Sequence, residues 1–159
     1  MHYSLVALGF MKKEASIKDH IDYLKYVLEH KYRIYEPMRD LNLSRWQALT
    51  HDLNKLRPSQ WNPYVDYWDP DPDPPSEVLA FNKARRRHFE ASPHHWHLLP
   101  NKSQDLKYQL EAVADWYASA KTQRPKEIGS FKNWYEENKD NLTIKPNARE
   151  IVERTLYAG

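Results

Sequence analysis

Residues 49–56 read Leu-Thr-His-Asp-Leu-Asn-Lys-Leu, so an imidazole and a carboxylate stand side by side at His51 and Asp52, three residues before Lys55. Further candidate ligands occur along the chain: His20, His30, His88, His94, His95 and Asp115. Imidazole and carboxylate groups in this number indicate a divalent metal site. A metal held by such groups activates a water molecule or polarises a phosphoryl oxygen, so the pattern favours an enzyme.

The composition favours a single all-α domain. A chain of 159 residues fits one domain, and six Trp and eleven Tyr give its core large aromatic side chains. Only Gly9, Gly129 and Gly159 are glycines, so neither a P-loop nor a dinucleotide-binding fingerprint can be formed. The scarcity of glycine and of β-branched runs predicts helices rather than sheets.

Charge and hydropathy indicate which binding partners and which cellular compartment to expect. The net charge is only +2, with both signs mixed along the chain, which does not favour nucleic-acid binding. The chain has no cysteine, which excludes disulfides and thiolate ligands and suits a reducing cytoplasm. No apolar run is long enough to span a membrane. We expect a cytoplasmic protein (host cytoplasm if phage-encoded), with residues 1–15 as a loose extension and 16–159 as one helical domain.

The first helix is expected to begin at the N-cap Ser16 and to run to about Arg39. Its apolar side chains fall on one stripe: Ile17, Ile21, Leu24, Leu28 and Tyr35. On a helical wheel His20 lies about 60° from the centre of this stripe and His30 about 140° away. The wheel therefore predicts that His20 points inward and serves as a ligand, whereas His30 has a structural role.

The second helix is expected to begin with a capping box at Ser44 and to end before Pro58. It would carry His51 and Lys55 on one face, with Asp52 about 100° round. Helices are also predicted at about 76–90, 103–121, 130–138 and 147–156, with a turn or short helix at 59–68, a stiff acidic loop at 69–75 and an interruption at 92–97. The expected fold is a bundle of about five to six helices.

Asp115 has two possible environments. It lies roughly opposite the apolar stripe of its own helix, which consists of Leu106, Leu110, Val113 and Tyr117. Either Asp115 faces water, or this helix is central and buried on both sides. The second possibility is supported by the small or apolar side chains nearby: Ala112, Ala114, Trp116 and Ala118.

The order of these residues resembles the HD superfamily of metal-dependent phosphohydrolases, with a His on the first helix, His-Asp on the next, further His residues and a late Asp. Residues 51–55 look like the His-Asp-x-x-Lys variant of the HD-GYP phosphodiesterases, in which the Lys approaches the substrate phosphate. The chain lacks the Gly-Tyr-Pro element, so that substrate does not carry over. Segments 20–31, 51–55, 92–96 and 114–116 together resemble a family of small uncharacterised proteins common in phages and bacteria.

The resemblance implies an HD-type helical domain and a ligand set. A first metal would be held by His20, His51, Asp52 and Asp115. A second would be held by His88 and either His94 or His95, with Asp52 bridging the two. The expected cofactor is one or two divalent ions of Mn, Fe, Ni, Co, Zn or Mg.

The same resemblance implies a phosphohydrolase acting on a small nucleotide-like phosphate ester or a phosphodiester. Asp52, Lys55 and His95 would be catalytic, and Lys55, Arg86 and His95 would bind the substrate. Lys55 and Arg86 would neutralise charge on the phosphoryl oxygens. The basic run around Arg86, which consists of Lys83, Arg85, Arg86 and Arg87, is either a solvated helix face or a collar for such a phosphate.

Two other functions fit the same residues. The first is a non-catalytic, metal-stabilised binding protein that acts on a phage or host partner through the aromatic segment 61–68 and the acidic proline-rich loop. The second is an HD-type oxygenase with two irons. Iron absorption and oxygen consumption would identify the oxygenase, whereas loss of folding on chelation without hydrolysis would favour the binding protein.

Overall fold

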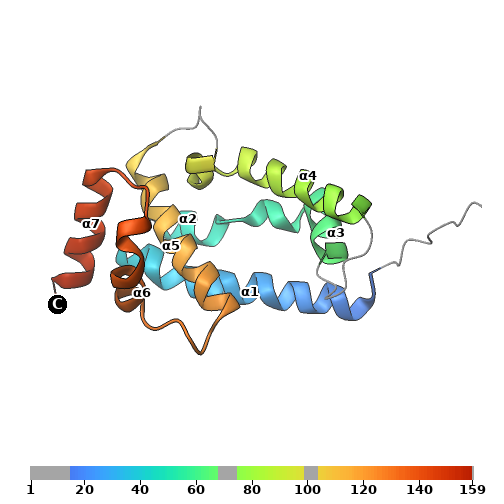
Figure 1. Cartoon of the computed structure of the whole chain (residues 1–159), viewed down its shortest axis with the longest axis horizontal. Helices are drawn as coiled ribbons and strands as arrows, with labels where there is room; N and C mark the ends of the chain where they lie inside the picture. The colour runs from blue at the N-terminus through green and yellow to red at the C-terminus, as the bar shows by residue number, and fades with distance from the viewer. Residues whose placement is uncertain (1–14, 68–74, 99–103, 159) are drawn as a thin grey trace, which may run out of the picture.

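A computed structural model describes residues 15–67, 75–98 and 104–158 of the chain (Figure 1). Over these residues the fold is all-α, as predicted, and contains no strand. The elements are α1 (Ile17–Asp40), α2 (Arg45–Thr50), η1 (Leu53–Leu56), α3 (Pro58–Tyr67), α4 (Pro75–Ala91), η2 (Pro93–Leu98), α5 (Leu106–Gln123), α6 (Phe131–Asn138), η3 (Lys139–Asn141) and α7 (Pro146–Tyr157), where η denotes a 3-10 helix. The described part contains seven α-helices, more than the five to six expected. One reason is that the segment at 59–68, predicted as a turn or short helix, forms α3.

Local sequence signals set several helix starts. Ser16 forms a complete capping box with Asp19 at the start of α1. The side chains of Ser44 and Ser130 each accept a hydrogen bond from the backbone amide three residues on, and so cap α2 and α6. These three predicted starts are confirmed because a cap depends only on residues within one turn.

The main core lies around α5, which packs against α1, η2, α6 and α7. Ile34 of α1, Val113 of α5, Trp134 of α6 and Val152 of α7 all belong to it. Every residue from Gln109 to Asp115 is buried, so α5 is covered on all sides. The second environment predicted for Asp115, a central helix, is therefore the correct one.

A smaller core joins α1 to α3. Tyr23 and Val27 of α1 pack with Val65 of α3. Trp61 and Tyr64 of α3 lie against the Tyr23 ring, with ring centroids 4.8 and 5.8 Å away. These aromatic side chains therefore serve packing, which accounts for much of the aromatic segment at 61–68.

The apolar stripe predicted to face the core from α1 is exposed, so this prediction is wrong. Ile17 is 80% exposed and Leu28 is 57% exposed. The helix instead buries Tyr23, His30 and Ile34 on a different face. The helical-wheel prediction considered only which face of α1 is most apolar. The buried face instead carries His30, which pairs with Asp115 of α5.

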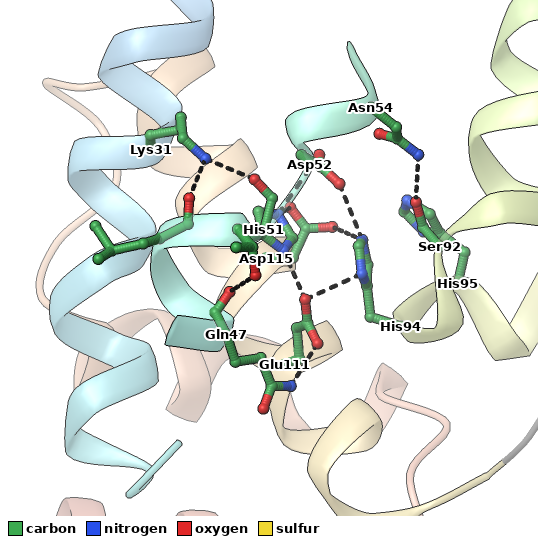
Figure 2. Close-up of polar contacts among 12 residues, drawn as sticks. Lys31, Gln47, His51, Asp52, Asn54, Ser92, His94, His95, Glu111 and Asp115 are labelled. Carbon is green, nitrogen blue, oxygen red and sulfur yellow. Dashed lines mark hydrogen bonds and ion pairs between the residues drawn. The ribbon is translucent and has the colours of Figure 1, made fainter. Parts of the chain in front are cut away.

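The second helix is broken at the His-Asp pair, contrary to the prediction of one helix up to Pro58. α2 ends at Thr50, His51 is extended (φ −50°, ψ 128°), and Asp52 is left-handed (φ 55°, ψ 19°). Aspartate is one of the few residues other than glycine that adopt this conformation readily. Lys31 of α1 donates hydrogen bonds to the carbonyls of Leu49 (3.1 Å) and His51 (2.6 Å) and so satisfies the end of α2 (Figure 2). The break directs both members of the pair into the interior.

Some predictions concern residues outside this description. The predicted N-terminal extension, apart from Ala15, and the acidic proline-rich stretch at 69–74 both lie there. Among the described helices, none is both long and apolar enough to cross a lipid bilayer.

Candidate metal centre

Eight ionisable side chains from α1, α4, η2, α5 and the break after α2 converge in the interior, and Figure 2 shows most of them. This His/carboxylate cluster consists of His30, His51, Asp52, His88, His94, His95, Glu111 and Asp115, each at most 8% exposed. Charged groups are rarely buried in such density unless they are paired or bind a metal ion. The cluster is therefore the candidate functional site.

A first group of ligand atoms surrounds one point between α1, α5 and the break after α2. It contains His30, His51, Asp52 and Asp115. Nε2 of His30 lies 3.1 Å from Oδ1 of Asp115 and 3.4 Å from Nε2 of His51. Nε2 of His51 lies 3.5 Å from both Oδ1 of Asp115 and Oδ2 of Asp52. In a tetrahedral site with metal–ligand bonds of about 2.1 Å, neighbouring ligand atoms lie about 3.4 Å apart. The distances in this group therefore fit a cation such as Zn²⁺.

A second group shares Asp52 with the first and also contains His88, His94 and His95. Oδ1 of Asp52 lies 3.5 Å from Nε2 of His88 and 3.4 Å from Nε2 of His94. Nε2 of His95 lies 3.0 Å from Nε2 of His88. The two oxygens of Asp52 thus face different groups, which is the arrangement of a carboxylate that bridges two metal ions.

The hydrogen-bonding state of the cluster also fits a cation. Oδ1 of Asp52 and Nε2 of His94 are buried and lie 3.4 Å apart without a well-formed hydrogen bond, whereas Oδ2 of Asp52 is paired with Nζ of Lys55 at 2.6 Å. Buried polar atoms normally have a hydrogen-bond partner, so two such atoms at one place point to a missing ligand. Buried His and Asp groups here can therefore hold a metal ion.

Glu111 is part of the cluster and was missed from the sequence. Its Oε1 lies 2.8 Å from Nδ1 of His51 and 3.2 Å from Nδ1 of His94, and its Oε2 accepts a hydrogen bond of 2.6 Å from Gln47 (Figure 2). Because a carboxylate only accepts, both imidazoles donate from Nδ1, and their Nε2 atoms face the metal positions. The available signal was spacing: Glu111 precedes Asp115 by four residues and so shares its helix face.

His88 is oriented in a similar way from α4. Its Nδ1 lies 3.0 Å from Oδ1 of Asn54, whose amide nitrogen donates to Oγ of Ser92 at 3.0 Å. This chain of contacts turns Nε2 of His88 toward Asp52. Asn54 directly precedes Lys55 in the starting motif, so the motif also supplies an orienting group.

The cluster concentrates negative charge. Burial opposes ionisation of Asp52, yet His51 and Lys55 hold the pKa of Asp52 well below its usual range. In the same way, hydrogen bonds from His30 and His51 hold the pKa of Asp115 well below the usual value. The pKa of Glu111 falls to about 2 through its bonds to His51 and His94, again against burial. Three ionised carboxylates in one buried site are a strong attraction for a divalent cation.

The histidines divide into two kinds. Burial would lower the pKa of His51, but Asp52, Asp115 and Glu111 outweigh it and raise that pKa to about 10. Burial dominates at His88 and His95, where it lowers the pKa to about 4 and about 2. His88 and His95 are thus neutral, as metal ligands must be, and a metal ion at the first group would displace a proton from His51.

We predict that the metal-free protein loses stability as the pH falls from about 6.5 to about 5. His88 and His95 stay neutral in the folded chain but take up protons near pH 6.5 when it unfolds. The unfolded state therefore binds more protons in this window, which lowers the free energy of unfolding by up to about 1.4 kcal/mol per pH unit for each imidazole. His51 opposes this slope only near pH 6.5, where its imidazole is about half protonated in the unfolded chain but, because of its raised pKa, protonated in the folded chain. Urea unfolding with a chelator present measures the slope, and His95→Gln should roughly halve it.

His20, the predicted first ligand, lies outside the cluster. Nε1 of Trp61 donates a hydrogen bond of 2.8 Å to its Nδ1, and the two rings stack. His30 occupies the place predicted for His20, one turn closer to the break that carries His51. The prediction is wrong because it rested on the stripe of α1, which does not face the core.

Lys55 and Arg86, the predicted phosphate contacts, differ in position. Nζ of Lys55 lies 2.6 Å from Oδ2 of Asp52, and Asp52 raises the pKa of Lys55 against the effect of burial, so it stays cationic at the edge of the cluster. The side chain of Arg86 is 78% exposed and pairs with Glu90 at 2.8 Å on the outer face of α4. The structure therefore does not bring Arg86 to the cluster, since it lies two residues from the inward-facing His88 on α4.

His94 and His95 were expected to divide into one ligand and one substrate contact. The structure brings both into the second group. A kink in η2 at His95 (φ −87°, ψ 25°) lets consecutive side chains face the same site. His88 and Asp115 lie where the predicted ligand set requires them.

A pocket of about 460 Å³ leads from the surface to the cluster. His51, Asp52, His94 and Glu111 lie along its inner part, and its lining also includes Trp46 of α2 and Tyr108 and Lys107 of α5. This volume falls in the range of small-molecule sites. The cluster is therefore reachable by a ligand although its side chains are buried.

Comparison with known proteins identifies the family of this chain but no activity. No curated protein matches the sequence, and no solved structure matches it. Residues 19–158, which include all eight residues of the cluster, match a family model. The chain belongs to the family of unknown function DUF5662.

Proposed function

We propose that this protein is a metal-dependent hydrolase of phosphate esters with two metal positions, similar in its chemistry to the HD superfamily. The observation that carries the proposal is the position of Asp52, which belongs to two groups of buried ligands and directs one oxygen to each. A shared carboxylate between two sets of imidazoles is the ligand arrangement of binuclear hydrolases. A purely structural metal site would not require two sets of ligands that share one carboxylate.

The residues divide into three roles. His30, His51 and Asp115 would hold one cation, and His88, His94 and His95 the other, with Asp52 between them. Glu111 and Asn54 orient imidazoles from outside. Lys55 is the cation that faces the shared carboxylate and can neutralise a phosphoryl oxygen.

Divalent cations bound here would supply a water of lowered pKa and polarise the phosphoryl group. Asp52 would help to hold both cations, because its carboxylate is ionised and belongs to both groups. The pocket would admit a phosphate ester of nucleotide size, and the exposed ring of Trp46 offers a flat surface beside it.

The test is elemental analysis of protein purified without chelators, together with hydrolysis of a nucleotide panel and a generic phosphodiester. Two metal ions per chain and hydrolysis that a chelator abolishes would support the proposal. Bound iron with visible absorption and oxygen consumption would replace it with the oxygenase. Metal that maintains folding without any turnover would favour the binding protein.

We predict that Glu111→Gln weakens metal binding by about 10–100-fold, which is the usual effect of losing an outer carboxylate. The amide lacks the negative charge that both imidazole N–H groups meet at Oε1, and its NH2 group takes the place of Oε2, which accepts from the amide nitrogen of Gln47. Competition with a chromogenic chelator measures the affinity. Glu137→Gln on the exposed side of α6 is the matched control and should bind metal normally. An unchanged affinity in Glu111→Gln would rule out its orienting role.

A further inference from the structure

One face of α1 carries an apolar stripe that the other described elements leave largely exposed, although Tyr35 at its end lines a pocket with Phe131 and Leu156. Its members and their exposed fractions are Ile17 (80%), Ile21 (47%), Leu24 (40%), Leu28 (57%) and Tyr35 (38%). They are spaced by four, three, four and seven residues, which is the heptad repeat of a helix that packs against another helix. A 24-residue helix is about 36 Å long, so the stripe is long enough for such a contact.

The stripe lies away from both the core and the metal centre. In Figure 1, α1 runs along the lower edge of the molecule with α2 and α3 above it. His30, which points into the cluster, lies about 140° round the helix from the centre of the stripe. Another helix could therefore cover the stripe without displacing a ligand.

The charges beside the stripe indicate what covers it. Lys18, Lys25, Glu29 and Glu36 all lie on the same flank, with the basic pair in the first half of α1 and the acidic pair in the second. When two copies of a helix pack antiparallel about a two-fold axis, the same flank of each copy meets. Lys18 would then face Glu36 of the second copy, and Lys25 would face Glu29, both about a centre at residue 27.

The apolar residues give nearly the same centre. An antiparallel pair centred at residue 26 places Ile17 against Tyr35 and Leu24 against Leu28. Charges and apolar side chains thus agree within one residue on a single self-complementary arrangement. We infer that the protein forms a homodimer through antiparallel packing of α1 against α1 of a second copy.

The flank charges are available for such a contact. Lys18 and Lys25 each lie 3.1 Å from Asp22, and Glu29 lies 2.5 Å from Arg33, all within α1. Exposed pairs of this kind contribute little and exchange readily. Removing the apolar side chains of the stripe from water is favourable, and this burial supplies the driving force for dimerisation.

Light scattering on the full-length chain tests the dimer. We expect twice the chain mass of 19.1 kDa for the wild type and the single-chain mass for Leu28→Glu. Leu79→Glu, at a leucine of α4 that is 70% exposed, is the matched control and should remain dimeric. Unchanged circular dichroism and metal content in Leu28→Glu would show that it is still folded. A monomeric wild type, or a dimer that survives Leu28→Glu, would overturn the inference.

A charge exchange tests the antiparallel register. K18E/K25E makes the flank entirely acidic, and E29K/E36K makes it entirely basic, so each variant alone should be monomeric through repulsion. Mixing the two should restore a dimer that contains one chain of each. Dimers in both separate variants, or no association in the mixture, would contradict this register.

Discussion

Asp52→Asn is expected to empty both metal positions and to reduce hydrolysis by at least about 10³-fold, equal to about 4 kcal/mol in the barrier. Asp52 is the residue that contributes an oxygen to each ligand group, at 3.5 Å from His51 and 3.4 Å from His94. An amide removes the negative charge and one acceptor. Asparagine adopts left-handed backbone as readily as aspartate, so the turn at this position is kept.

The measurement is metal content per chain together with kcat/KM on the best substrate. Asp140→Asn, at an exposed aspartate of η3, is the control for charge alone and should behave as the wild type. A variant Asp52→Asn that keeps two metal ions and normal turnover would disprove the bridging role. Loss of turnover with both metals retained would show that the group acts on the substrate or water instead.

His30→Gln is expected to remove one of two metal ions, whereas His20→Gln leaves both. Of these two histidines, only His30 reaches the cluster, and its Nε2 lies 3.1 Å from Asp115 and 3.4 Å from His51. Nδ1 of His20 is occupied by the indole of Trp61. Loss of one inner ligand should weaken the first position by on the order of 100-fold, more than a typical outer group.

Titration calorimetry on chelator-stripped protein separates the two positions, because the second group does not include His30. Both variants replace a histidine of α1 by the same residue, so they control for each other. Circular dichroism must show the same helix content in both. A metal loss in His20→Gln with normal binding in His30→Gln would restore the ligand predicted from the wheel.

Most helix positions could be predicted from the sequence because their signals are local. Ser16, Ser44 and Ser130 each cap the helix that follows through the third residue on. The end of α2 could not be predicted in this way. Its sequence continues without a breaker, and the carbonyls of Leu49 and His51 at the break are satisfied by Lys31 of another helix.

The sequence also showed which residue types form the candidate site, but it did not show which of the individual histidines and carboxylates belong to it. Asp115 was named as a ligand although its helix gave it two environments, and only the packing of α1, η2, α6 and α7 around α5 decides for the buried one. Glu111 was overlooked because a glutamate on a helix is usually solvated, and nothing near it in the chain marks it as buried.

The sequence by itself determined the all-α class, the capped helix starts and a supply of imidazole and carboxylate ligands that includes the His51-Asp52 pair. The tertiary structure decided which face of α1 is buried, and therefore that His30 rather than His20 meets Asp115. The physical reason is that local signals depend on neighbours within one turn, whereas the burial of a charge depends on its partner from another helix. The apolar stripe that misled the wheel has its own explanation in the proposed second copy of the chain.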